Sequence, residues 1–155
     1  MSEQPQPQFS IEKIYTKDIS LELPHAPQIF LERENPKVEV QMATKGEPIR
    51  DDFHHVLLTV TVTAKLNERV LFLVEVGQGG IFQIKNVPAE ELEPILNITC
   101  PNILFPYARE AVSSTISRCG LPPVWLAPVN FEVIYQQRAQ LLAEQQRQAS
   151  GQVSH

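Results

Sequence analysis

The sequence has little cysteine, no long apolar run and no excess of basic side chains, and each shortage excludes a class of protein. Its apolar runs, such as the one around residues 71–74, fall far short of the roughly 18–20 residues that a membrane-spanning helix needs. The 2 cysteines cannot build a disulfide framework, and a chain of 155 residues buries enough surface to fold without one. With 13 basic and 18 acidic side chains, and the basic ones dispersed, nucleic acid is a disfavoured partner.

Both ends of the chain are polar and predict flexible tails around one domain. Residues 1–8 and 147–155 are rich in Gln, Ser and other polar residues, which bury too little apolar surface to offset the entropy of ordering. The first residues also lack the basic and apolar regions of a secretory signal. We therefore expect a single domain over residues 9–146, tails at 1–8 and 147–155, and a cytoplasmic protein.

Apolar and polar residues alternate in four segments of the first half, and this period of two predicts strands. The expected strands span residues 9–23, 38–42, 56–66 and 70–76, and the third has the most regular alternation and many β-branched residues. A polar turn at residues 67–69 joins the last two strands into a hairpin. Gly79 and Gly80 are expected to end the sheet, and a proline-bounded loop spans residues 24–36.

After about Pro88 the apolar spacing becomes helical. Pro94 and Pro101 are expected to keep a first helical segment short, and Asn102 to cap a helix that stops at Gly120. Asn130 is expected to cap a last helix over about residues 131–146. Four strands followed by two helices predict an α+β fold with a four-stranded antiparallel sheet.

No residue pattern for catalysis or metal binding stands out. Cys100 and Cys119 flank one helix, too far apart for a disulfide within one subunit, and no histidine motif of a thiol enzyme surrounds them. His54 and His55 are neighbours on a predicted strand, so they point to opposite faces and cannot chelate one metal ion. The glycine-rich segment 77–80 lacks the Gly-Lys-Ser/Thr ending of a phosphate loop. We expect no catalytic residue, no metal and no cofactor.

Apolar and aromatic side chains occur in several segments that should contact water, and one small sheet cannot cover them all. They lie in residues 29–31, 81–82 and 103–107 and at Trp125, Phe131 and Tyr135. Two interpretations stay open. The side chains are ordinary core residues and loop anchors, or they line subunit interfaces or a groove for apolar ligands.

Four segments resemble, in the same order, signature segments of the SecB family of bacterial export chaperones. They are residues 14–20 (IYTKDIS), 72–82 (FLVEVGQGGIF), 100–110 (CPNILFPYARE) and 126–131 (LAPVNF), and the similarity runs from about Phe9 to Leu142. The resemblance implies an ATP-independent holdase without enzyme activity or membrane insertion. It also implies a homotetramer, built as a dimer of dimers, that keeps precursor proteins unfolded and export-competent and delivers them to the SecA motor of the Sec translocase.

The resemblance also implies three sets of site residues, carried over position by position. The set that would contact the basic tail of SecA, by charge complementarity, is Asp18, Glu22, Leu73 and Glu75. The set that would hold the tetramer together is Val74, Val76 and Gln78. The set that would line the groove for unfolded clients is Phe30, Val40, Met42, Phe82, Phe105, Tyr107, Trp125, Phe131 and Tyr135. This chain departs from the family pattern at Glu34, where many members carry Trp, and in its non-acidic C-terminus.

Two other classes of function compete with this interpretation. A non-enzymatic scaffold or small apolar-ligand-binding domain would use the same apolar surplus for one fixed partner. A thiol enzyme would need a reactive cysteine at position 100 or 119. Delayed refolding of several unrelated proteins would separate the holdase from the scaffold, and rapid alkylation of one cysteine would indicate the thiol enzyme.

Overall fold

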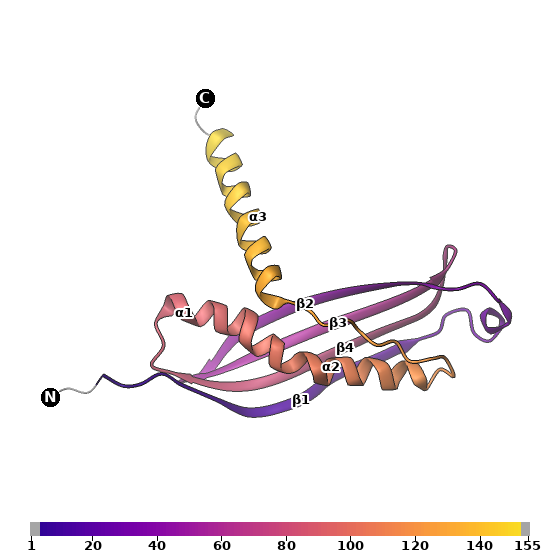
Figure 1. Cartoon of the computed structure of the whole chain (residues 1–155), viewed down its shortest axis with the longest axis horizontal. Coiled ribbons are helices and arrows are strands. Elements are labelled where there is room, and N and C mark those ends of the chain that lie inside the picture. Colours follow the sequence, from indigo (N-terminus) through magenta and orange to yellow (C-terminus); the bar gives the residue numbers. More distant parts are fainter. Residues whose placement is uncertain (1–3, 153–155) are drawn as a thin grey trace.

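Four long strands form a single antiparallel sheet in the computed structural model, which describes residues 4–152 (Figure 1). The strands are β1 (Gln8–Glu22), β2 (Lys37–Arg50), β3 (Phe53–Leu66) and β4 (Arg69–Lys85), in the spatial order β1-β4-β3-β2. A 3₁₀ helix, η1 (Gln28–Leu31), lies in the connection from β1 to β2. The predicted four-stranded antiparallel sheet followed by helices is confirmed.

A helical layer covers one face of this sheet. The helix α1 (Ala89–Pro94), the π-helical turn η2 (Ile95–Thr99) and α2 (Cys100–Ser117) follow one another without a break and run along the sheet (Figure 1). The helix α2 packs on β4, β3 and β1, whereas α3 (Phe131–Gln152) projects away from the sheet (Figure 1). No helix among residues 4–152 is long and apolar enough to cross a membrane.

The alternation of β3 is the clearest link from sequence to core. Its even-numbered residues from Val56 to Leu66 are buried beneath the helical layer, and its odd-numbered residues are half-buried on the opposite face. Since the side chains of a strand alternate with a period of two, every second residue faces α2. Asn67 makes the tight turn into β4 with a φ of 57°, a conformation that Asn tolerates well. The predicted hairpin of β3 and β4 is confirmed.

The prediction that Gly79 and Gly80 end the sheet is wrong, because β4 continues through them to Lys85. Here the glycines provide space instead of a turn. A Cβ atom on Gly79 would stand 2.7 Å from the ring of Tyr15, and one on Gly80 would stand 2.7 Å from the ring of Phe82 and 3.0 Å from Leu104. Glycine inside a strand often marks such a close approach.

The predicted caps and stops of the helices are partly wrong. Pro94 and Pro101 do not interrupt the helical path, because the π-helical turn η2 lies between them, and Asn102 lies inside α2. The side-chain amide of Asn97 in that turn donates a hydrogen bond of 2.8 Å to the carbonyl oxygen of Glu93. Asn130 does cap α3, since its Oδ1 accepts a hydrogen bond of 3.2 Å from the backbone N–H of Val133. This is the usual arrangement of an N-cap.

Two expected boundaries also move. The strand β2 reaches Arg50 and not position 42, and Pro48 is tolerated there because β2 is an edge strand. The helix α3 continues through residues 147–152, where we expected a flexible tail. Residues 4–7 of the expected N-terminal tail have no regular structure, while residues 1–3 and 153–155 lie outside the described residues.

Candidate functional site

An apolar groove follows β2 on the side of the sheet that carries the helices. Val38, Val40 and Met42 point to this side, since they pair with the core positions 64, 62 and 60 of β3. The helix α2 packs on the other three strands, and it leaves Val38 40% and Val40 43% exposed. This row of side chains and the two hollows at its ends are called the β2 groove below.

The first hollow, here the tip hollow, lies where β3 turns into β4 and has a volume of about 340 Å³. Its walls come from the loop that contains η1, from the start of β2, from the ends of β3 and β4, and from the segment after α2. The lining residues are Ile29, Phe30, Glu32, Glu34, Pro36, Val38, Leu66, Leu71, Phe72, Leu121, Pro122, Pro123 and Val124. Most of them are apolar, so the tip hollow suits apolar side chains.

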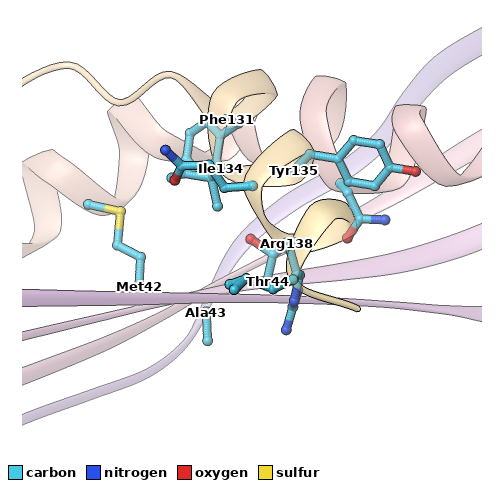
Figure 2. A pocket seen from close by; sticks show the side chains of 10 residues that line it. Met42, Ala43, Thr44, Phe131, Ile134, Tyr135 and Arg138 are labelled. Atoms are coloured by element: carbon cyan, nitrogen blue, oxygen red, sulfur yellow. The ribbon is translucent and has the colours of Figure 1, made fainter. Parts of the chain in front are cut away.

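The second hollow, here the α3 hollow, lies between β2 and the first turns of α3 and has a volume of about 350 Å³. Figure 2 shows the side chain of Met42 rising from the strand on the side where Phe131 and Ile134 of α3 lie. The residues that complete its lining are Ala43, Thr44, Asn97, Tyr135, Gln137, Arg138 and Leu141. Val40 lies between Val38 and Met42 on the same strand face, and therefore between the two hollows, but it lines neither of them.

Five of the predicted client residues belong to this groove. Phe30 lines the tip hollow, Met42, Phe131 and Tyr135 line the α3 hollow, and Val40 lies between the two hollows. The loops and the edge strand thus bring together residues that are about a hundred positions apart in the sequence. That Phe30, Val40, Met42, Phe131 and Tyr135 contact clients stays a prediction.

Four predicted client residues lie elsewhere. Phe82 is buried in the core, stacked on Phe9 with ring centroids 5.7 Å apart, and Phe105 is buried edge-on against Phe131 at 6.0 Å. Neither Phe82 nor Phe105 lines the tip hollow or the α3 hollow, so the structure places both outside the β2 groove. They looked exposed because the sheet was expected to end before Phe82 and a helix to start near Asn102. Tyr107 and Trp125 are exposed but line neither hollow.

Several lining residues were missed by the sequence analysis, and two of them carried a usable signal. Val38 shares the strand face of Val40, so the period of two could have included it. Ile134 precedes Tyr135 on the same predicted helix and could have been included by its position. The segment of residues 121–124 has no period, and only the tertiary structure brings it to the tip hollow.

The opposite face of the sheet carries the four residues expected to contact SecA. In the register of β1 and β4, Glu22 pairs with Leu73, and Ser20 pairs with Glu75, so these side chains point away from α2. Asp18 pairs with Gly77 in the same unbroken register, so it lies on this face too, and the one-residue irregularity of β1 falls before it, between Thr16 and Asp18. We call Asp18, Glu22, Leu73 and Glu75 the acidic face.

The acidic face has one leucine between exposed carboxylates. Asp18, Glu22 and Glu75 are exposed and Leu73 is half-buried, while Thr61 donates a hydrogen bond of 3.4 Å to Glu75 Oε2. A hollow of about 250 Å³ beside Asp18 and Glu75 is also lined by Lys17, Leu57, Thr59 and Gly77, so one basic residue lies among its carboxylates. This combination can attract a positively charged segment and provide apolar contact for it.

The three residues assigned to the tetramer interface lie inside the protomer. Val74 and Val76 are 0% exposed beneath the helical layer, and Gln78 accepts a hydrogen bond of 3.1 Å from Thr16 through Oε1. As folded here, these side chains are not exposed for direct contact with a second copy, and their role in holding the tetramer together stays a prediction. Their alternation on β4 places them on the same side as the core of β3, a side that the sequence could not distinguish from a subunit interface.

A histidine on the acidic-face side of the sheet is held by an aromatic side chain from β1. Tyr15 lies against Gly79 of β4 and reaches His55 of β3, with 2.7 Å between its hydroxyl and Nε2. Burial lowers the pKa of His55, the nearby Lys17 lowers it further, and Glu47 partly opposes both. The neutral imidazole is therefore favoured in the folded protein.

We expect the free energy of unfolding to fall as the pH drops below about 6.5, the ordinary pKa of histidine. In that range the unfolded chain takes up a proton on His55, whereas folded His55 stays neutral. The folded state therefore loses stability relative to the unfolded state as the pH falls from about 6.5 to the lowered pKa of folded His55. Urea unfolding on both sides of that pH should show a smaller pH dependence for His55→Gln than for the wild type. The exposed His25 provides the matched control, and an equal effect of His25→Gln would contradict this prediction.

The cysteines and the polar clusters offer little for catalysis. Cys100 is buried, and burial raises the pKa of its thiol to about 12; burial also raises the pKa of Cys119. Both groups stay protonated near neutral pH, and a protonated thiol is a poor nucleophile. Among residues 4–152, no cluster of three or more His, Cys, Asp or Glu side chains could hold a metal ion.

Comparisons of the sequence with known proteins point to one family. The model of the family described as preprotein translocase subunit SecB matches residues 2–141. The protein-export protein SecB of Chromobacterium violaceum is 64% identical over 143 residues, which cover 90% of this chain and 95% of that protein. The protein of the same name from Neisseria meningitidis serogroup B is 60% identical over 139 residues, covering 89% of this chain and 95% of that one.

A solved structure has the same fold. It is a SecB-like chaperone of Mycobacterium tuberculosis in complex with a peptide from an antitoxin. The TM-score is 0.66 at 16% sequence identity, and the match covers 78% of this chain and 90% of that chain. At this identity the likeness concerns the arrangement of the sheet and helices.

Proposed function

Since this chain belongs to the SecB family of protein-export chaperones, we propose that it is an ATP-independent holdase that keeps precursor proteins unfolded in its β2 groove. The observation that carries this proposal is the pair of apolar hollows along β2, with the exposed Val40 between them. An unfolded segment could place one apolar side chain in each hollow. The proposed location of the protein is the cytoplasm, where precursors are made.

The groove fits an extended polypeptide better than one compact ligand. The strand β2 forms an edge of the sheet, so one side of its backbone has no partner strand among the described residues. An extended client can add main-chain hydrogen bonds along such an edge, and the two hollows can take its side chains. This mode of binding depends little on the client sequence.

The chemistry of the lining supports binding of many clients. Phe30, Phe131 and Met42 bury apolar area without requiring one pattern of hydrogen bonds, and the thioether of methionine adapts to differently shaped partners. Holding needs no nucleotide, because binding only the unfolded state shifts the folding equilibrium by mass action. The proposed activity is therefore binding and not catalysis.

The acidic face is the proposed contact with SecA. It lies on the opposite side of the sheet from the β2 groove, and its three carboxylates would attract a basic segment. Copies of the chain are proposed to assemble as a dimer of dimers. In support, the edge strand β1 carries the partly exposed apolar residues Phe9, Ile11 and Ile19, which a second copy could cover.

The test is the refolding of several unrelated slow-folding proteins in the presence of substoichiometric chaperone. We expect the wild type to delay them all, and Val40→Ser to weaken client binding about threefold to fivefold, since it removes apolar area between the hollows. Gln41→Ser is the control, because residue 41 points to the other face of β2. If no client is delayed, the scaffold or ligand-binding alternative replaces the holdase. Equal effects of the two variants would remove Val40 from the client site.

A further inference from the structure

A pair of polar bridges joins two walls of the tip hollow. Glu32 forms an ion pair with Arg69, and the side-chain amide of Asn67 donates a hydrogen bond of 3.0 Å to Glu34 Oε2. Glu32 and Glu34 line the tip hollow and belong to the loop after η1, whereas Asn67 and Arg69 form the turn from β3 to β4. The bridges therefore connect the loop wall with the end of the sheet.

The loop has one firm attachment and one weak attachment, and a client-facing residue lies between them. Ile29 is 1% exposed and anchors the loop in the core. The side chains of Glu32 and Arg69 remain 33% and 46% exposed, and exposed ion pairs are weak and screened by salt. Phe30 follows the anchor, precedes the bridges and lines the tip hollow.

We propose that Glu32 and Arg69 are positioning residues that act as a releasable latch, setting how far the loop wall with Phe30 can move away from the tip hollow. The Asn67–Glu34 hydrogen bond supports the same closed position. This inference rests on the proposed function in that the tip hollow holds client side chains. The latch closes over a bound apolar segment, slows its departure, and is released by salt or by loss of either charge.

Reversal of one charge, and then of both, tests the latch. Glu32→Arg or Arg69→Glu places like charges together, and the double variant restores an ion pair with opposite polarity. In each single variant we expect amide hydrogen exchange in the loop, and dissociation of a client, to become about threefold to fivefold faster at low salt, a size typical of exposed ion pairs. The double variant should restore both rates. The client is a reduced and alkylated protein that cannot refold.

Glu39→Arg is the matched control for Glu32→Arg, because it makes the same change of net charge on the opposite face of β2. The latch is overturned if the double variant exchanges as fast as the single variants, or if the single variants exchange like the wild type. Its role in holding clients is overturned if exchange follows the charges but dissociation does not. If the wild type binds no client, the proposed function fails, and exchange still decides whether the latch exists.

Discussion

We expect the double variant Asp18→Ala/Glu22→Ala to bind SecA about tenfold more weakly than the wild type at low salt, with client binding and assembly unchanged. The two carboxylates lie on one face of β1, beside Leu73 and Glu75 of β4. Their removal lowers the attraction for a basic segment without touching the core, since both are exposed. Binding measured by calorimetry at low and high salt should show the difference shrinking as the charges are screened.

The control removes two exposed carboxylates from the other edge of the same sheet face. Glu39 and Glu47 on β2 point away from the helical layer, as the acidic face does, so Glu39→Ala/Glu47→Ala makes an equal change of net charge. A local site predicts that this variant binds SecA almost as well as the wild type. Equal weakening by both variants would show that only net charge matters, and the acidic face would then lose its assignment.

A second large effect is expected at Gly80, where alanine should lower the free energy of unfolding by about 2 kcal/mol, within the range of about 1–3 kcal/mol for overpacked cores. The added Cβ would stand 2.7 Å from the ring of Phe82 and 3.0 Å from Leu104. Both neighbours are fully buried between β4 and α2, so neither can move aside freely. Urea unfolding at a fixed protomer concentration measures the loss, since association affects apparent stability.

Gly77 is the internal control for Gly80. It lies on the same strand but faces the open side of the sheet, where an added Cβ would stand 3.6 Å from both Asp18 and Leu57. These are ordinary van der Waals distances, and alanine restricts the unfolded chain more than glycine does. We expect Gly77→Ala to leave the stability unchanged or slightly higher. A loss equal to that of Gly80→Ala would mean that β4 needs glycine for its backbone and not for space.

The sequence predicted most of the sheet because its strongest signal is local. In β3, every second residue from Val56 to Leu66 is buried, as the alternation requires. The glycines of β4 lie inside the strand because Tyr15 and Leu104 approach its backbone closely, and both residues are far away in the sequence. No local pattern carries that information. The same holds for Pro94 in α1 and Pro101 in α2, since the π-helical turn η2 lies between them and the helical path continues.

The candidate sites depended on register and on tertiary burial, and these decided which predictions hold. The period of two keeps Asp18 and Glu22 on one face, but the extra residue of β1 before Asp18 puts Thr16 on the other face, and periodicity alone does not reveal such a bulge. Phe82 and Phe30 both looked like apolar residues beside irregular segments. One is stacked on Phe9 in the core, and the other lines the tip hollow. Only the packing of α2 and of the loops separates them.

The sheet is a single layer of backbone, and its two surfaces serve the two proposed partners. The β2 groove lies on the surface that carries α2, and the acidic face lies on the reverse surface of β1 and β4. A cargo polypeptide and a motor docked on these surfaces would not compete for space. The two proposed sites would therefore allow a ternary complex to form before any cargo is released, with handover as a transfer between neighbours instead of an exchange through solution.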